Sequence, residues 1–260
     1  MTIPFSGAGA PLTQAGLDSV VKTVGCDLPS LWAVMAVETR GFGFLPLTRQ
    51  PKILFERHVF YRLTSGAHGN NGDISSSKSG GYLGGAAEYG RLEAAAKLNQ
   101  EAAIGSASWG LGQIMGYHAK RLKYASAMDM AQAFGKSEDE QIFAMGNFIA
   151  SESALTKALV TGNWRKVAFY YNGSNYAKNE YDAKLEFHYE KFKQQGCPDV
   201  EVREAQALLT YLKYNPKGID GFWGDNSKKA LASFLVNEGM PAAAAPDAII
   251  LAALRKKAGF

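Results

Sequence analysis

Residues 31–38 read Leu-Trp-Ala-Val-Met-Ala-Val-Glu, and the interpretation of the fold starts from this segment. Helical periodicity places Leu31, Val34 and Met35 on one apolar face. Glu38 falls on the same face, at offsets of seven, four and three residues from them. A carboxyl group beside an apolar surface is partly desolvated, which raises its pKa above ~4.3. Its place in the last turn of the helix raises the pKa further, because a helix C-terminus carries negative potential.

An acid that stays protonated near neutral pH can donate a proton to a leaving oxygen. The pattern therefore marks Glu38 as a candidate general acid. The alternative is a surface glutamate at the edge of the apolar face, paired with Arg40 nearby. The spacing alone leaves both interpretations open.

The composition is that of a globular protein with a mild excess of positive charge. The 260 residues are 47% hydrophobic and 12% aromatic, which is enough to build a core. Lys and Arg number 28 against 24 Asp and Glu, a net charge of +4. That excess is too small to indicate nucleic acid, and it favours an anionic surface such as a bacterial envelope.

Neither a membrane segment nor a leader is expected from the sequence. The first ten residues have no basic start followed by an apolar run, and no segment approaches the ~18 apolar residues that cross a bilayer. We therefore expect the chain to stay in the cytoplasm unless it is released. Cys26 and Cys197 have no metal-ligand spacing, so two reduced thiols are favoured over a disulfide.

Most of the chain has the pattern of one helical domain, which we place at residues 1–196. Pro29 suits a first helical turn, and Asp27 is a possible cap. A loop-rich excursion over 41–90 holds a cluster of Gly, Ser and Asn, and such loops are often functional. Helical patterning is predicted over 12–24, 28–39 and 88–195, with breaks at 105–108, 116, 135 and 172–175.

A second, smaller domain is predicted at residues 197–260. Its three helical runs are about a dozen residues each, too short to persist alone, so they must pack together. The predicted runs are 199–213, 226–237 and 247–257, with a core of Leu208, Leu212, Ile219, Leu231, Phe234, Ile250 and Leu254.

Four motifs occur in order along the larger domain. They are 37–45 (VETRGFGFL), 52–58 (KILFERH), 107–116 (ASWGLGQIMG) and 171–173 (YNG). Together they resemble the N-acetylmuramidase domain of phage endolysins, over roughly residues 12–195. The resemblance implies a mainly α, lysozyme-like fold in which a catalytic glutamate ends a helix beside a cleft. Glu38 occupies that position.

The third and fourth motifs supply candidate substrate-binding residues. Residues 108–114 resemble the Gly-Leu-Met-Gln-Ile segment of lytic transglycosylases and goose-type lysozymes, with Gly112 in place of Met. Glycines here would let a helix approach a sugar closely. The fourth motif resembles the Tyr-Asn-Ala-Gly segment of the same superfamily, whose tyrosine faces the catalytic acid. The candidates are Ser108, Trp109, Gln113, Tyr171 and Asn172, with Trp109 divided between cleft and core and Tyr170 expected in the core.

Glu56 is the candidate second catalytic carboxylate. A glycosidase that hydrolyses its substrate needs a partner to stabilise positive charge or activate water, ~5 to 9.5 Å from the acid. The alternative is a structural contact of Glu56 with Arg57 or His58 that holds the loop. Asp73 in the excursion is a weaker candidate, and His58 has no partner at metal-ligand spacing.

The smaller domain resembles the three-helix peptidoglycan-binding domain of many wall hydrolases, through residues 211–224 (YLKYNPKGIDGFWG). Asp220 would make a turn. Phe222 and Trp223 could stack on sugar or peptide or serve only the small core, and Trp223 is favoured over Phe222 as the ligand contact. Ser227 replaces the family's threonine, and residues 234–235 depart from its Phe-Gln pair. These departures weaken the ligand assignment more than the fold.

Three functions remain from the sequence. The favoured one is an endolysin that hydrolyses the β-1,4 bond between N-acetylmuramic acid and N-acetylglucosamine for host lysis. The alternatives are a lytic transglycosylase that forms 1,6-anhydro products, and a non-catalytic wall-binding protein. Peptidoglycan is the expected partner of a monomer that needs no metal or organic cofactor, binds no nucleic acid and does not insert stably into membranes. We expect action in the periplasm after release through a holin.

Overall fold

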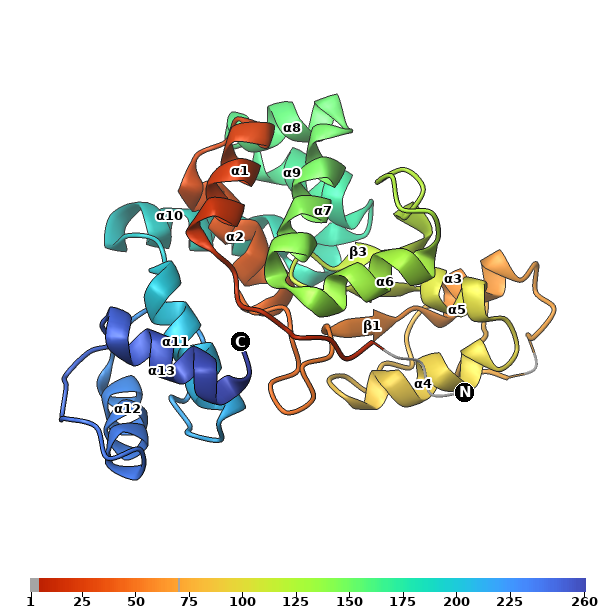
Figure 1. The fold of residues 1–260 in the computed structure, drawn as a ribbon. Coiled ribbons are helices and arrows are strands. Elements are labelled where there is room, and N and C mark those ends of the chain that lie inside the picture. The colour runs from red at the N-terminus through yellow and green to blue at the C-terminus, as the bar shows by residue number, and fades with distance from the viewer. Residues whose placement is uncertain (1–4, 70) are drawn as a thin grey trace. The chain divides into compact units, whose positions relative to one another are not determined.

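The computed structural model describes residues 5–69 and 71–260. Residues 1–4, where the leader was assessed, and Asn70, within the excursion, lie outside the described residues. Contacts divide the chain into two compact units, each built from two stretches of sequence. Unit one takes in the chain up to residue 9 together with 43–151, and unit two is formed by 10–42 and 152–260. Both units are mainly helical, as predicted (Figure 1).

Unit one holds a small antiparallel sheet with the order β1-β2-β3. Strand β1 (Ile53–Phe55) pairs with β2 (Ala107–Trp109), and β2 pairs with β3 (Ile114–Met115). The helices of this unit are α3 (Arg57–Leu63), α4 (Ala87–Ala96), α5 (Gln100–Gly105), the 3-10 helix η1 (Gly116–His118), α6 (Ala127–Lys136) and α7 (Glu138–Ala150).

The third sequence motif is a hairpin, so the helical prediction for residues 108–114 was wrong. Gly110 and Gln113 at its turn have φ of +65° and +47°, which a continuing helix does not allow. An added Cβ at Gly112 would lie 2.7 Å from the Met145 side chain, so this glycine serves a close approach to α7.

Unit two contains the helix on which the sequence analysis began, α2 (Leu28–Thr39). Asp27 caps it as predicted, since its Oδ1 accepts from the Ser30 amide at 3.0 Å. Residues 31–35 are all buried, so α2 is enclosed on every side and not on one face alone. The other helices are α1 (Gln14–Val24), α8 (Ser153–Val160), α9 (Trp164–Asn172), η2 (Tyr176–Asn179), α10 (Tyr181–Gln195), α11 (Val200–Tyr211), α12 (Asp225–Asn237) and α13 (Ala248–Ala258).

By length and composition, no single helix among the described residues could cross a bilayer. Helices α1 and α2 pass that test only as a pair, and they are bent by 108° relative to each other.

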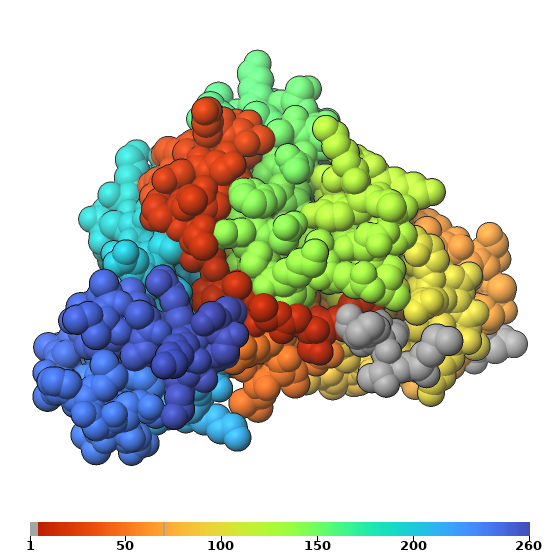
Figure 2. Space-filling view, in the orientation of Figure 1, coloured from red at the N-terminus to blue at the C-terminus, as the bar shows by residue number. Residues whose placement is uncertain are grey.

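The three C-terminal helices share a core of their own. In Figure 2 the residues of α12 and α13 form one contiguous blue region. Leu208, Leu231, Phe234, Ile250 and Leu254 are buried in this core as predicted, and Leu212 packs against it. Ile219 was wrongly predicted to belong to this core, because it lies on the loop after α11 and lines a cavity.

Arg203 of α11 joins the C-terminal helices to α2 within unit two. Its Nε and Nη2 donate to the Gly41 carbonyl at 2.8 and 2.6 Å, and its guanidinium lies 5.9 Å from the Trp32 ring centroid. Because these helices fall in the same contact unit as α2, a domain boundary at residue 197 stays a prediction.

Candidate active site

Glu38 lies in the last turn of α2 and is partly buried. The helix ends immediately afterwards, where Arg40 adopts a left-handed conformation with φ of 58° and its amide donates to the Ala36 carbonyl. Burial raises the pKa of Glu38 from 4.5 to about 7, and a hydrogen bond from the Tyr181 hydroxyl to Oε1 partly opposes this shift. The carboxyl group is therefore available as an acid at neutral pH.

Two tyrosines surround this carboxyl group. Tyr181, the buried first residue of α10, donates to Glu38 and was missed by the sequence analysis, because no motif includes it. Burial, and with it the charge of Glu38, raises the pKa of Tyr171 well above 10. Tyr170 was predicted in the core but is 39% exposed. Asn172 is exposed at the end of α9.

The pKa of Glu38 leads to a prediction about pH. A general acid acts in its protonated form, so with Glu38 in that role kcat/KM should be high below the pKa and fall as pH rises through about 7. Well above it, the rate should drop roughly tenfold per pH unit, as expected for loss of one proton. The measurement is initial rate against pH on soluble glycan fragments. A rate that stays constant well above that pKa would contradict the assignment.

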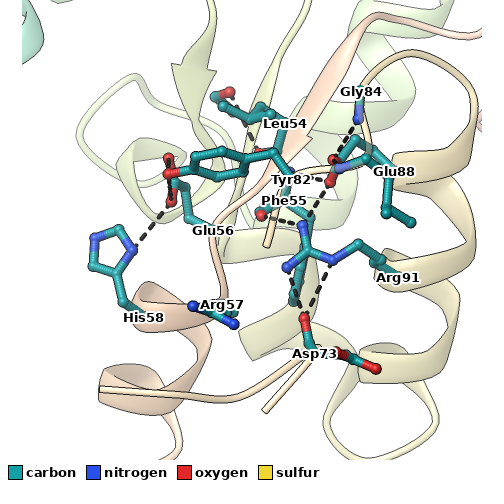
Figure 3. Close-up of polar contacts among 12 residues, drawn as sticks. Leu54, Phe55, Glu56, Arg57, His58, Asp73, Tyr82, Gly84, Glu88 and Arg91 are labelled. Carbon is teal, nitrogen blue, oxygen red and sulfur yellow. Dashed lines mark hydrogen bonds and ion pairs between the residues drawn. The ribbon is translucent and has the colours of Figure 1, made fainter. Parts of the chain in front are cut away.

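Glu56 directly follows β1 and occupies the N-cap position of α3 (Figure 3). The Tyr82 hydroxyl lies 3.0 and 2.8 Å from its two carboxylate oxygens, and His58 Nδ1 lies 3.1 Å from Oε2. The Glu56 side chain is 17% exposed. The His58 contact is one that the structural alternative expected. Glu38 and Glu56 belong to different units, and their pairing across a substrate stays a prediction.

Arg57 does not pair with Glu56, contrary to the other structural alternative. Its guanidinium instead donates to three carbonyls of the excursion, those of Gly72, Lys78 and Ser79, at 2.8 to 3.0 Å. Arg57 thereby orders the Gly- and Ser-rich segment that also carries Tyr82. The loop-rich region thus has a positioning role next to Glu56.

A buried ion pair of α4, Glu88 with Arg91, holds the surroundings of Glu56, and no sequence motif includes it. The Glu88 carboxylate accepts from the amides of Leu83 and Gly84 at 2.6 and 2.9 Å, and from the Phe55 amide at 3.2 Å. Arg91 Nη1 lies 2.8 Å from the same carboxylate. Burial alone would raise the pKa of Glu88, but these donors outweigh it and hold the pKa below its usual value. The loop before α4 and the end of β1 are thereby tied together.

Removing the Glu88 carboxylate should lower the stability of unit one. The Glu88→Ala variant leaves the buried Arg91 guanidinium without its anionic partner, which costs on the order of 3–5 kcal/mol. Thermal melting should report a correspondingly lower Tm. Glu93→Ala, at an exposed position of the same helix, is the matched control and should melt like the parent. Equal melting temperatures for both variants would contradict a supporting role for the pair.

The polar side chains of the hairpin form hydrogen bonds within the hairpin itself. Ser108 Oγ donates to Gln113 Oε1 at 2.7 Å, and Gln113 Nε2 donates to the Gly110 carbonyl at 2.9 Å. The structure places Trp109 in the core, fully buried, with Nε1 donating to the Ile104 carbonyl at 3.0 Å. A ring so enclosed supports the hairpin and has no face to offer a sugar. Gln113, partly exposed, remains the better candidate for a substrate contact.

The two aromatic candidates of the C-terminal helices, Phe222 and Trp223, lie in different surroundings. Trp223 packs against the three-helix core and donates from Nε1 to the Ala244 carbonyl, whereas Phe222 is 38% exposed. Asp220 shapes the turn as expected, since its Oδ1 accepts from the Phe222 amide at 3.0 Å. The buried Gln206 amide also holds this turn, with Oε1 accepting from the Asp220 and Gly221 amides.

No group of three or more His, Cys, Asp or Glu side chains is placed to hold a metal ion in the described part of the chain.

No curated protein has a significantly similar sequence. The family model described as N-acetylmuramidase matches residues 27–193. The crystal structure of Burkholderia AP3 phage endolysin is 38% identical, with a TM-score of 0.64 over 72% of each chain. The chain therefore belongs to the N-acetylmuramidase family, and it is a lysozyme-type glycoside hydrolase with a lysozyme-like fold.

Proposed function

We propose that this protein is an endolysin that hydrolyses the β-1,4 bond between N-acetylmuramic acid and N-acetylglucosamine, with Glu38 as the general acid. The observation that carries the proposal is the Glu38 carboxyl group, whose pKa is raised to about 7 beside the Tyr181 hydroxyl. Membership of the N-acetylmuramidase family supports the assignment of the bond that is cleaved.

In this mechanism Glu38 donates its proton to the glycosidic oxygen as the bond to the anomeric carbon breaks. Positive charge develops on the sugar ring, and an anionic side chain lowers the energy of that state. We assign this second role to Glu56, which either stabilises the cation or takes a proton from the attacking water. The water oxygen then bonds to the anomeric carbon, and the water proton passes to Glu56 or, where Glu56 only stabilises the cation, to the Glu38 carboxylate.

The product chemistry tests the proposal directly. Purified sacculi digested with the protein should release muropeptides with a reducing N-acetylmuramic acid end, which borohydride reduces before mass spectrometry. A lytic transglycosylase would instead yield 1,6-anhydro ends, lighter by one water and resistant to reduction. Sacculi left intact, with the protein bound to them, would indicate a wall-binding protein without activity.

The C-terminal helices, residues 197–260, are proposed to bind peptidoglycan. Their separate core supports independent folding, and the exposed Phe222 ring offers a stacking surface. Tethering a hydrolase to its polymeric substrate raises the local substrate concentration. We further propose that the protein acts as a monomer in the periplasm, after release through a holin.

A fusion of residues 197–260 to a fluorescent protein tests this binding role. It should sediment with purified sacculi, and Phe222→Ala should weaken retention several-fold, since truncating a binding aromatic typically costs more than ~1 kcal/mol. Val236→Ala removes another exposed apolar side chain and is the matched control. If the fusion sediments no more than the fluorescent protein alone, these helices have no targeting role.

A further inference from the structure

Unit two contains a cavity of about 330 Å³ that none of the roles above explains. It is lined by the last turns of α2 and α10 and by the loop after α11. Trp32, Ala36 and Arg40 contribute from α2, while His188 and Lys191 contribute from α10. Its volume is within the range of cavities that bind small ligands.

This cavity is distinct from the site around Glu38. Trp32 and Ala36 are spaced by four residues, so they lie on one face of α2, and Arg40 follows directly after the helix. Glu38 follows Ala36 by two residues, a rotation of about 200° at 3.6 residues per turn. The catalytic carboxyl group and the cavity therefore occupy opposite faces of the same helix end.

Two buried polar atoms on residues that line the cavity find no hydrogen-bond partner among the described residues. They are Trp32 Nε1 and His188 Nδ1. The Trp32 side chain is 1% exposed, and an indole N–H can only donate, so only an acceptor could pair with it.

The charged groups around the cavity favour an anionic acceptor. Arg40 and Lys191 line it, and Arg203 lies behind it, with its guanidinium 5.9 Å from the Trp32 ring centroid. Asp220 is the one acid among the described lining residues, and its Oδ1 already accepts from the Gln206 amide and the Phe222 backbone. The charged residues that line the cavity therefore have a net positive charge.

The remaining wall is apolar and suits small side chains. Ala36, Pro198, Ile219 and the Phe222 ring line it, and Lys191 Nζ lies 5.9 Å from the centre of that ring. A ligand that fits therefore combines a carboxylate with small apolar groups, such as the methyl groups of alanine. A sugar hydroxyl would satisfy the indole N–H but would leave the cations without a counter-charge.

We propose that this cavity binds the free C-terminal carboxylate of a short peptide with small apolar side chains, the stem peptide of peptidoglycan. The identity of the peptide rests on the proposed function, since peptidoglycan supplies such stems beside every cleavable bond. The site would let the protein recognise the peptide part of the wall through the same helix that carries Glu38. Residues of α2, α10 and the loop after α11 would then contact the same ligand.

The test uses the full chain carrying Glu38→Gln, so that no turnover disturbs binding. The probes are a synthetic stem tetrapeptide with a free C-terminal carboxylate, the same peptide as its C-terminal amide, and an N-acetylglucosamine oligomer. Calorimetry should show the acid binding at least roughly tenfold more tightly than the amide, as loss of a charged hydrogen-bond partner implies. The Trp32 indole N–H resonance, assigned with Trp32→Phe, should shift with the acid.

Matched lysine variants separate the cavity from general charge attraction. Lys191→Gln should weaken binding of the acid roughly tenfold, as removal of a charged partner implies, whereas Lys193→Gln on the exposed side of α10 should not. Equal affinity for acid and amide, preference for the sugar oligomer, or an unmoved indole resonance would each overturn the proposal. The readout is binding, so failure of the hydrolytic function would not affect it, and its own failure would leave hydrolysis untouched.

Discussion

The Glu38→Gln variant should lose bond cleavage by at least ~100-fold while remaining folded, because general acid catalysis alone contributes that much. Glutamine keeps the shape of the side chain and an oxygen to accept from Tyr181, but it has no proton to give. The measurement is kcat on soluble glycan together with lysis of sacculi. Glu186→Gln, at an exposed position of α10, is the matched control and should retain full activity.

The same variant should change how stability depends on pH. The folded-state pKa of Glu38 is about 7 against 4.5 as the ordinary value, so folding favours the protonated form. The parent protein should therefore lose stability as pH rises from 4.5 through about 7, whereas Glu38→Gln should not show this loss. The expected difference above that window is on the order of 1–3 kcal/mol. A variant that keeps more than roughly a tenth of the parent rate would refute the assignment.

Replacing Glu56 by glutamine should lower turnover at least tenfold, at little cost in thermal stability, on the same scale of one catalytic group. The loss follows from removing the negative charge that would stabilise the sugar cation or activate water. Glutamine can still accept a hydrogen bond from Tyr82, so the loop should keep its conformation. The measurements are kcat on soluble glycan and the melting temperature. In a substrate complex, the carboxyl groups of Glu56 and Glu38 should lie within ~10 Å of each other.

Replacing His58 by alanine separates catalysis from structure at this position. It removes the contact with Glu56 but leaves the carboxylate, so activity should fall much less than in Glu56→Gln. The opposite outcome is that Glu56→Gln melts much earlier and keeps its rate per folded molecule. Glu56 would then be a structural anchor, and a single-acid transglycosylase mechanism would become the better explanation.

Sequence patterns predicted those features that depend on local spacing. The Asp27 cap, the end of α2 near Gly41 and the enclosed position of Glu38 all follow from residues within one or two helical turns. The three C-terminal helices were predicted for the same reason, since each combines a short apolar stripe with nearby turn residues.

Features that depend on long-range contacts were not predictable. Tyr181 meets Glu38 across 143 positions, and Glu88 binds the Phe55 amide across 33, so neither leaves a local pattern. The helical prediction after the break at 105–108 was wrong, because the strands of the hairpin have only three and two residues, too few to show alternation. Trp223 was favoured as a ligand contact because tryptophan suits sugars, but the small core needed its ring.

The bond between Arg203 and the Gly41 carbonyl bears on engineering of this enzyme. Lytic enzymes are natural candidates for exchanging one wall-targeting module for another, and residue 197 looks like a convenient junction. A junction there would remove a fully buried arginine and leave the carbonyl after α2 without these two donors. Chimaeras that keep α11, or that install an arginine at the equivalent place, should preserve the helix end on which Glu38 depends.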